Sequence, residues 1–413
     1  MHFSEYRITP QIKQNLEIMG FKRPTDIQYK CIPTILKGED LLAIAQTGTG
    51  KTAAFAIPVA HRLLDRKRAM RYTGIRCVVM VPTRELALQI TEVFDKIGQN
   101  TRLKTLCLFG GVDQDPQIAR LDGGVDILVT TPGRMFDLHH QGHINLSKAE
   151  FLILDEADRM LDMGFLKDIQ DAVSLLPNNR QTLFFSATIN DRIKKLAYSL
   201  VSRNAVRIQI SPKDPVSKNV RHSVAFIAMD DKRFFLERLV KENPEAKMLV
   251  FVRTKVRAER VHAALGRVGI DAETIHGDKE QHARMETLAR FRTGEIKLLI
   301  ATDVSARGID VPDVEFVVNY DLPDVAENYV HRVGRTGRGE RMGDAISFCS
   351  IEEKPLLEAI EAFIGKPITQ TNIDKGEYQY TLRMTEDVGD KWRDVMREVE
   401  EAEKYFSKKK KKG

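Results

Sequence analysis

The sequence predicts an α/β fold with two tandem domains, each a mainly parallel sheet flanked by helices. Short apolar runs of strand length recur within residues 41–185 and again within residues 224–348, and helix-like segments alternate with them. Buried runs that alternate with helices are typical of parallel sheets covered on both faces. A polar segment with two prolines separates the two stretches, and 413 residues are too many for one core.

The apolar runs place the elements in order along the chain. Strands are expected at residues 41–45, 77–81, 105–109, 126–130, 151–154 and 182–185, and then at 224–228, 248–252, 297–300, 315–319 and 345–348. Helices are expected between them, for example at 84–97 and 255–265. The predicted domains are residues 1–209 and 220–367, with a linker at 210–219 and a C-terminal extension at 368–413. An apolar stripe that begins at Trp392 predicts a helix in this extension, packed either on the protein itself or on a partner.

The composition is that of an ordinary soluble globular protein, with 42% hydrophobic and 30% charged residues. No run approaches the ~18 uncharged apolar residues of a membrane span. The first residues lack the basic and apolar regions of a signal peptide. The four cysteines are scattered, which indicates neither a zinc site nor a disulfide framework. We therefore expect a cytoplasmic protein.

A glycine-rich loop follows the first predicted strand. Residues 45–52 read Ala-Gln-Thr-Gly-Thr-Gly-Lys-Thr. Such a loop offers backbone N–H groups and a helix N-terminus to a triphosphate. Lys51 would place its charge on the outer phosphates, and the Thr52 hydroxyl would be a ligand for Mg²⁺. The rest of the expected cradle is Thr47, Gly48, Thr49 and Gly50.

An acidic tetrad, Asp-Glu-Ala-Asp at residues 155–158, directly follows the predicted strand 151–154. In open α/β sheets, ligands bind beyond the carboxyl ends of the strands. Asp155 would contact Mg²⁺ there, and Glu156 would orient the attacking water. Together with the glycine-rich loop, this pattern predicts hydrolysis of a nucleoside triphosphate.

Two further segments refine the prediction. Within residues 20–28, Phe21 can stack on a base, and the amide of Gln28 can pair with N6 and N7 of adenine, which favours ATP. Residues 331–338 read His-Arg-Val-Gly-Arg-Thr-Gly-Arg, with arginines three apart and glycines between them. That spacing suits guanidinium groups directed at phosphate, and it predicts an arginine finger from the second domain.

These segments, in this order, resemble the DEAD-box RNA helicases over roughly residues 1–367. The runs that match are 20–28, 45–52, 82–86, 110–111, 131–134, 155–158, 186–188, 249–255, 281–284, 301–310 and 331–338. Ala45 stands where the general phosphate loop has glycine, and it is the usual residue in this family. The resemblance implies two RecA-like domains that close on ATP and RNA together.

The resemblance also implies roles for individual residues. Arg335 and Arg338 are the implied arginine fingers, and Asp310 is the implied contact to the ribose. The implied couplers of hydrolysis to strand separation are Asp158, Ser186, Thr188 and His331. The implied RNA contacts are Pro82, Thr83, Arg84, Gly111, Thr131, Gly133 and Arg134 in the first domain and Thr254, Arg284 and Thr302 in the second. Hydroxyls, glycine amides and helix starts hold phosphates without reading bases, so we expect little sequence preference.

The net charge of +6 is concentrated at the carboxyl terminus. Lys408–Lys412 are five consecutive lysines, so the remainder of the chain carries only +1. Affinity of the folded part for nucleic acid must therefore come from patterned charge. The lysine run itself is either a solubilising end or an RNA tether.

The expected function is ATP-dependent unwinding of short RNA duplexes or remodelling of RNA–protein complexes, with ATP hydrolysis stimulated by RNA. An ATP-gated RNA clamp with little unwinding would carry the same motifs, and a DNA-directed translocase is a second alternative. The compact layout is typical of bacterial helicases of ribosome assembly or RNA turnover, although compact eukaryotic translation-initiation helicases share it. We expect a monomer that does not associate with membranes.

Overall fold

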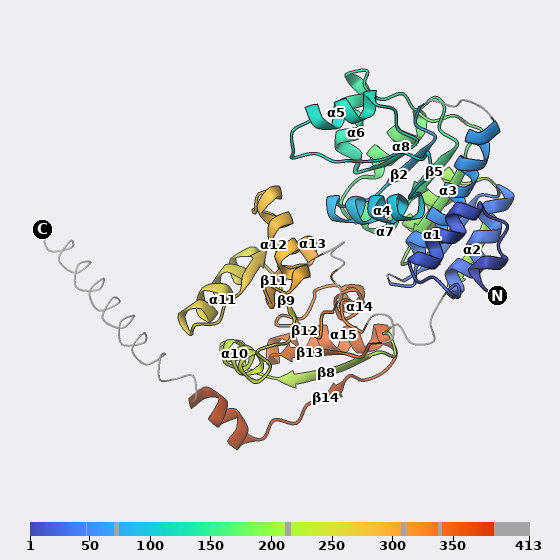
Figure 1. The fold of residues 1–413 in the computed structure, drawn as a ribbon. Helices are drawn as coiled ribbons and strands as arrows, with labels where there is room; N and C mark the ends of the chain where they lie inside the picture. The colour runs from blue at the N-terminus through green and yellow to red at the C-terminus, as the bar shows by residue number, and fades with distance from the viewer. Residues whose placement is uncertain are drawn as a thin grey trace, which may run out of the picture. The chain divides into compact units, whose positions relative to one another are not determined.

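The computed structural model describes residues 1–46, 48–69, 74–210, 216–306, 311, 313–337 and 341–383. These residues form two compact units, one up to residue 210 and one from residue 216 (Figure 1). Several predictions lie outside the described residues. They concern Thr47, Asp310, Arg338, the inner part of the linker, the stripe that begins at Trp392 and the lysine run.

The first unit is a seven-stranded parallel sheet with the strand order β3-β4-β2-β5-β6-β1-β7. Its strands are β1 (Leu41–Ala45), β2 (Cys77–Met80), β3 (Thr105–Leu108), β4 (Ile127–Thr130), β5 (Phe151–Leu154), β6 (Gln181–Ser186) and β7 (Val206–Ile210). The flanking helices are α1 (Pro10–Ile18), α2 (Asp26–Lys37), α3 (Lys51–Ala69), α4 (Arg84–Ile97), α5 (Asp115–Asp122), α6 (Pro132–His140), α7 (Ala157–Asp162), α8 (Leu166–Ser174) and α9 (Asp191–Leu200), after a short 3₁₀ turn at Phe3–Glu5.

Both faces of this sheet are buried except at the edge strand β7, which explains why most of its strands are largely apolar runs. In β1, Leu41 and Ala43 belong to the core on one face, whereas Leu42 and Ile44 belong to the core on the other. The alternation follows from the two-residue period of a strand. Helices α1–α4 supply the first core, and α6–α9 supply much of the second.

The second unit repeats the architecture, with the strand order β10-β11-β9-β12-β13-β8-β14 and parallel pairing throughout the described strands. Its strands are β8 (Val220–Phe226), β9 (Met248–Val252), β10 (Glu273–Ile275), β11 (Leu298–Thr302), β12 (Phe316–Asn319), β13 (Gly343–Cys349) and β14 (Thr369–Gln370). Its helices are α10 (Lys232–Glu242), α11 (Lys255–Arg267), α12 (Gln281–Thr293), α13 (Asp303–Ala306), α14 (Ala326–Val333) and α15 (Lys354–Ile364), with a 3₁₀ turn at Ile351–Glu353.

The predicted fold class is confirmed, and the differences lie at the edges of the sheets. The strand predicted at 224–228 is wrong in its bounds, because β8 begins at Val220 and ends at Phe226. Three strands that the apolar runs did not predict, β7, β10 and β14, lie at or near sheet edges, where short length and partial exposure weaken the pattern.

The second unit continues beyond residue 367, where the sequence pattern ends the domain. Strand β14 pairs with β8, and residues 375–383 form a helix. The Tyr378 hydroxyl donates to Asp231 Oδ2 at 2.7 Å, and its ring lies 4.9 Å from that of Phe235 on α10. The start of the extension is therefore fixed to the second unit. In the described part of the chain, every helix is too short or too polar to span a bilayer.

Candidate functional site

The phosphate loop joins β1 to α3 through two glycines that adopt left-handed backbone. Gly48 has φ 80° and Gly50 has φ 91°, conformations that favour glycine. Thr49 lies between them, and its hydroxyl donates to the Gln46 carbonyl at 2.8 Å. The loop ends where the 19-residue helix α3 begins at Lys51. The predicted loop-to-helix context is thus present.

Lys51 is the clearest sign that the loop takes an anion. It is 6% exposed, and its Nζ has no hydrogen-bond partner among the residues that the structure describes. A buried ammonium without a partner carries a large desolvation cost, which a phosphate oxygen would offset. Thr52, the next residue of α3, is half-buried.

Gln28 ties the predicted adenine-reading segment to the phosphate loop. Thr25 precedes α2 and forms a capping box with Gln28, whose Oε1 accepts the Thr25 N–H at 2.9 Å. Gln28 Nε2 donates to the Gly50 carbonyl at 3.1 Å, and the Thr25 hydroxyl donates to the Thr49 carbonyl at 2.8 Å. The amide keeps one further N–H and one further lone pair for a base. Phe21 is half-buried and packs edge-on against Phe3 at 5.5 Å.

The acidic pair lies at the carboxyl end of β5, and both carboxylates are buried. Asp155 is 2% exposed, and its Oδ1 accepts the Glu156 N–H at 3.0 Å. Burial raises the pKa of Asp155 to about 6, while the positive charge of Lys51 acts to lower it. Glu156 has φ 54° and ψ 47°, which is left-handed backbone in a residue other than glycine. Such a conformation costs about 1–3 kcal/mol and is concentrated at functional sites.

Asp158 joins the acidic tetrad to the loop after β6. Its Oδ2 accepts the N–H groups of Ala187 and Thr188, both at 2.9 Å, and the Thr188 hydroxyl at 3.2 Å. The Ser186 hydroxyl donates to the Thr188 carbonyl at 2.8 Å, which closes the loop on itself. The three predicted coupling residues of the first unit are therefore in direct contact.

The predicted RNA contacts of the first unit follow three neighbouring strands, β2, β3 and β4. Thr83 caps α4 by accepting the Leu86 N–H at 3.3 Å, and Pro82 precedes it in a buried position. Arg84 packs so closely on Gly111 that a Cβ at this glycine would lie 2.5 Å from Arg84 Nη1.

The predicted RNA contacts continue at the carboxyl end of β4, where Thr131 is the N-cap of α6 and Gly133 is exposed in the first turn of that helix. Arg134 donates to the Val112 carbonyl at 2.9 Å, which joins this helix to the loop after β3. Because β3, β4 and β2 are adjacent, the seven predicted residues lie together at the carboxyl ends of these strands.

The predicted RNA contacts of the second unit likewise lie at adjacent elements. Thr254 follows β9 and caps α11 by accepting the Arg257 N–H at 3.2 Å. Thr302 ends β11, and its hydroxyl is 3.0 Å from that of Ser305. Arg284 lies in the first turn of α12, which follows β10.

The arginines at 332 and 335 have different surroundings, which their spacing alone does not reveal. Arg332 is buried and forms a two-pronged ion pair with Asp303 at 2.6 and 2.7 Å. It also donates to the carbonyl of Asp321 at 2.7 Å, so it holds the unit together. Arg335 lies beyond the end of α14, and its Nε donates to the carbonyl of His331 at 3.2 Å.

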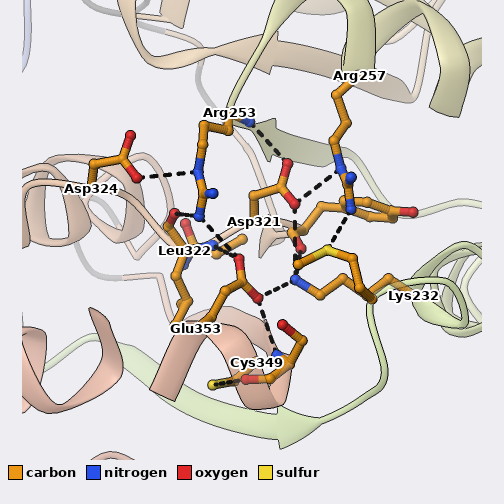
Figure 2. Close-up of polar contacts among 12 residues, drawn as sticks. Lys232, Arg253, Arg257, Asp321, Leu322, Asp324, Cys349 and Glu353 are labelled. Carbon is orange, nitrogen blue, oxygen red and sulfur yellow. Dashed lines mark hydrogen bonds and ion pairs between the residues drawn. The ribbon is translucent and has the colours of Figure 1, made fainter. Parts of the chain in front are cut away.

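A buried charge network that no sequence pattern indicates lies at the ends of β12 and β13 (Figure 2). The Glu353 carboxylate accepts Lys232 Nζ at 2.5 Å, the backbone N–H groups of Leu322 and Ser350 at 3.1 Å, and Arg253 Nη2 at 3.3 Å. Burial lowers the pKa of Lys232, and the charge of Glu353 opposes that effect. The two partners are 121 residues apart, so no local pattern indicates the pair.

Asp321, a second member of this network, holds the turn that carries Thr254. Its Oδ2 accepts the backbone N–H of Arg253 at 3.0 Å, and its Oδ1 lies 3.1 Å from Arg257 Nε (Figure 2). Since Arg257 also donates its backbone N–H to Thr254, the turn is held on both sides. The network therefore positions one of the predicted RNA contacts.

Both units of the chain are similar to known proteins. Residues 25–196 match the family model described as DEAD/DEAH box helicase, and residues 231–340 match the helicase conserved C-terminal domain. The ATP-dependent RNA helicase RhlB of Shewanella oneidensis is 39% identical over 377 residues, which are 90% of this chain and 86% of that protein. The protein of the same name from Shewanella frigidimarina is 39% identical over 377 residues, which are 90% of this chain and 87% of that protein.

Solved structures give the same result. S. cerevisiae Dbp5 bound to RNA and ADP BeF3 has a TM-score of 0.81 at 30% identity, and the match covers 94% of this chain and 99% of that one. Mss116p bound to ssRNA and AMP-PNP has a TM-score of 0.82 at 27% identity, with 93% of this chain and 81% of that one covered.

Proposed function

The chain belongs to the family of DEAD-box ATP-dependent RNA helicases, and we propose that the phosphate loop and the acidic strand end of its first unit form the ATP site. The enzyme hydrolyses ATP and unwinds RNA. The observation that carries the site assignment is the buried ammonium of Lys51, which has no hydrogen-bond partner among the described residues and is close enough to Asp155 to oppose the rise in its pKa. A triphosphate with its metal would satisfy both groups.

Within this site, Lys51 holds the outer phosphates, and Thr52 and Asp155 hold Mg²⁺. Magnesium keeps several waters and binds proteins through one or two carboxylates together with substrate phosphates, which fits a single buried aspartate beside a hydroxyl. When bound, it neutralises the charge that develops on the transferring phosphoryl group. Glu156 orients the attacking water and accepts its proton. Gln28 and Phe21 select adenine.

The second unit contributes Arg335, which stabilises charge on the phosphoryl group in the transition state. Such a finger is worth about 10³–10⁵ in rate. Arg338 and Asp310 have the roles that the resemblance implies, a second finger and a ribose contact. His331 couples this motif to the RNA contacts.

RNA lies along the strand ends that carry Arg84, Gly111 and Arg134 in the first unit and Thr254, Arg284 and Thr302 in the second. The groups there are hydroxyls, glycine amides, guanidiniums and helix N-termini, which contact phosphates and not base edges. Little sequence preference and a strong dependence on salt follow. We further propose that the enzyme is a cytoplasmic monomer that acts in ribosome assembly or RNA turnover. The relatives compared above are Shewanella proteins named ATP-dependent RNA helicase RhlB.

The test is steady-state ATP hydrolysis without nucleic acid, with single-stranded RNA and with the matching DNA. We expect strong stimulation by RNA alone. A rate indifferent to RNA would contradict the proposed gating, and equal stimulation by DNA would favour a DNA-directed enzyme. Displacement of a strand from a short RNA duplex at saturating ATP separates unwinding from an ATP-gated clamp, which would hydrolyse ATP without releasing the strand.

A further inference from the structure

The carboxylate of Glu156 is held by an arginine of α7, the short helix that begins directly after Glu156. Arg159 Nη1 lies 2.6 Å from Glu156 Oε2, and the side chains of the pair are only 4% and 7% exposed. A charge-assisted bond of this length fixes direction as well as distance. One oxygen of the carboxylate is therefore committed to Arg159.

The backbone beneath Glu156 is also constrained. At φ 54° Glu156 has a left-handed backbone conformation. Residues other than glycine adopt this conformation only when their surroundings require it. The ion pair with Arg159, three residues further on, spans this strained position. Two independent features, the backbone and the ion pair, thus set the direction of one carboxylate.

Arg159 is itself linked, through Asp158, to the loop after β6. Its backbone N–H donates to Asp158 Oδ1 at 3.1 Å, while Asp158 Oδ2 accepts the N–H groups of Ala187 and Thr188. A continuous chain of contacts therefore runs from the loop after β6 to Glu156. Within the part of the chain that the structure describes, Arg159 Nη2 is buried and has no hydrogen-bond partner.

We propose that Arg159 is a positioning residue for ATP hydrolysis. It holds Glu156 Oε2 so that the other carboxylate oxygen is presented to the attacking water, and it does not itself touch the nucleotide. The inference rests on the proposed function, because it requires Glu156 to be the group that orients water. An alternative is that the pair only stabilises α7, and the two roles have different kinetic consequences.

The experiment compares Arg159→Met, Arg159→Lys, Glu156→Gln and the double variant Arg159→Met/Glu156→Gln at saturating RNA. We expect Arg159→Met to lower kcat about 10- to 100-fold, since a displacement of about 1 Å in a reacting group has an effect of this order. KM for ATP and the RNA concentration at half-saturation should change less than about twofold. Arg159→Lys should recover part of the rate, because it keeps the charge but not the planar fork of donors.

The double variant decides whether Arg159 acts through Glu156. If it does, Arg159→Met should have no further effect on single-turnover hydrolysis once Glu156 is glutamine. An equal fold loss in both backgrounds, a kcat for Arg159→Met at or above that of the wild type, or a loss confined to KM would overturn the proposal. Should Arg159→Met fail to fold, Arg159→Lys in the two backgrounds gives the same comparison.

Failure of this inference and failure of the proposed function are distinguishable. Wild-type turnover in Glu156→Gln would refute the role of Glu156 and with it the role of Arg159. An inactive Glu156→Gln beside a fully active Arg159→Met would refute only the inference about Arg159. Thermal unfolding of each variant identifies a purely structural loss, which would lower the midpoint without changing the kcat of the folded enzyme.

Discussion

Substitution of Glu353 by glutamine should destabilise the second unit strongly. The carboxylate accepts four donors, from Lys232, Arg253 and the backbone of Leu322 and Ser350. Glutamine is nearly isosteric, but its NH₂ group donates and cannot accept from Lys232 or from a backbone N–H. The side chain of Lys232 is fully buried, so the substitution leaves its ammonium with only the more distant carboxylate of Asp321 to neutralise it.

The size of the effect follows from these contacts. Besides Glu353, Lys232 retains the carbonyl of Tyr320 at 2.7 Å and the carboxylate of Asp321 at 3.9 Å. Removal of one partner from a buried ion pair costs about 3–5 kcal/mol, because the charge that remains is poorly compensated. At about 2–4 °C per kcal/mol for a unit of this size, the unfolding midpoint should fall by about 6–20 °C. Differential scanning calorimetry of the full chain measures this shift.

Glu242→Gln is the matched control in the same unit. Glu242 is about half-exposed and pairs with Arg238 at 2.7 Å, and Arg238 keeps a second partner in Glu377. Exposed pairs contribute about 0–1 kcal/mol, so this variant should unfold close to the wild type. If the unfolding midpoint of Glu353→Gln is no lower than that of the control, the argument that Glu353 neutralises a buried ammonium group is refuted.

Three further predictions concern ligands. Burial raises the pKa of Asp155 to about 6, and only the carboxylate binds Mg²⁺, so the affinity for Mg²⁺·ATP should fall as the pH is lowered through about 6. Titration of a fluorescent nucleotide from about pH 7.5 to about 5.5 measures this affinity. A flat profile would contradict the raised pKa. Gly111→Ala should displace Arg84 and weaken RNA binding about tenfold by fluorescence anisotropy, since alanine at φ +75° is strained by about 1–2 kcal/mol and clashes. Gly124→Ala, at φ +80° with no atom within 4 Å of the added Cβ, shares the strain without the clash and should bind RNA normally. Deletion of Lys408–Lys412 should lower RNA affinity and reduce the salt slope by roughly 0.7 per phosphate contact if the run is a tether, and should change neither if it is only a solubilising end.

The sequence was sufficient to predict the positions of residues that follow a buried strand. The run 151–154 is apolar on both faces, so its end and the acidic tetrad after it are unambiguous in the sequence. The same holds for the phosphate loop after β1. Edge strands lacked this signal: β10 has only three residues, and both residues of β14 are exposed.

Contacts between residues distant in the sequence could not be predicted, because no local pattern indicates them. Lys232 and Glu353 are of this kind, and their charge in the sequence is indistinguishable from that of a solvated surface. Arg159 is different. An acidic residue followed three positions later by arginine at the start of a helix is a pattern that favours a side-chain pair. The sequence therefore carries a local signal for this pair.

The arginine motif shows why a correct motif still leaves the roles of its residues open. Arginines at 332 and 335 have the same separation as 335 and 338, and each is equally able to bind phosphate. Helix α14 ends at Val333, so Arg332 projects from its last turn into the unit and is neutralised by Asp303, whereas Arg335 lies past that end. The position of one helix terminus thus gives two neighbouring arginines different surroundings. Because both prongs of the Arg332 guanidinium bond to Asp303, Arg332→Lys should lower the unfolding midpoint, which thermal unfolding measures. Arg335→Lys tests the proposed finger, and we expect it to lower the rate of ATP hydrolysis.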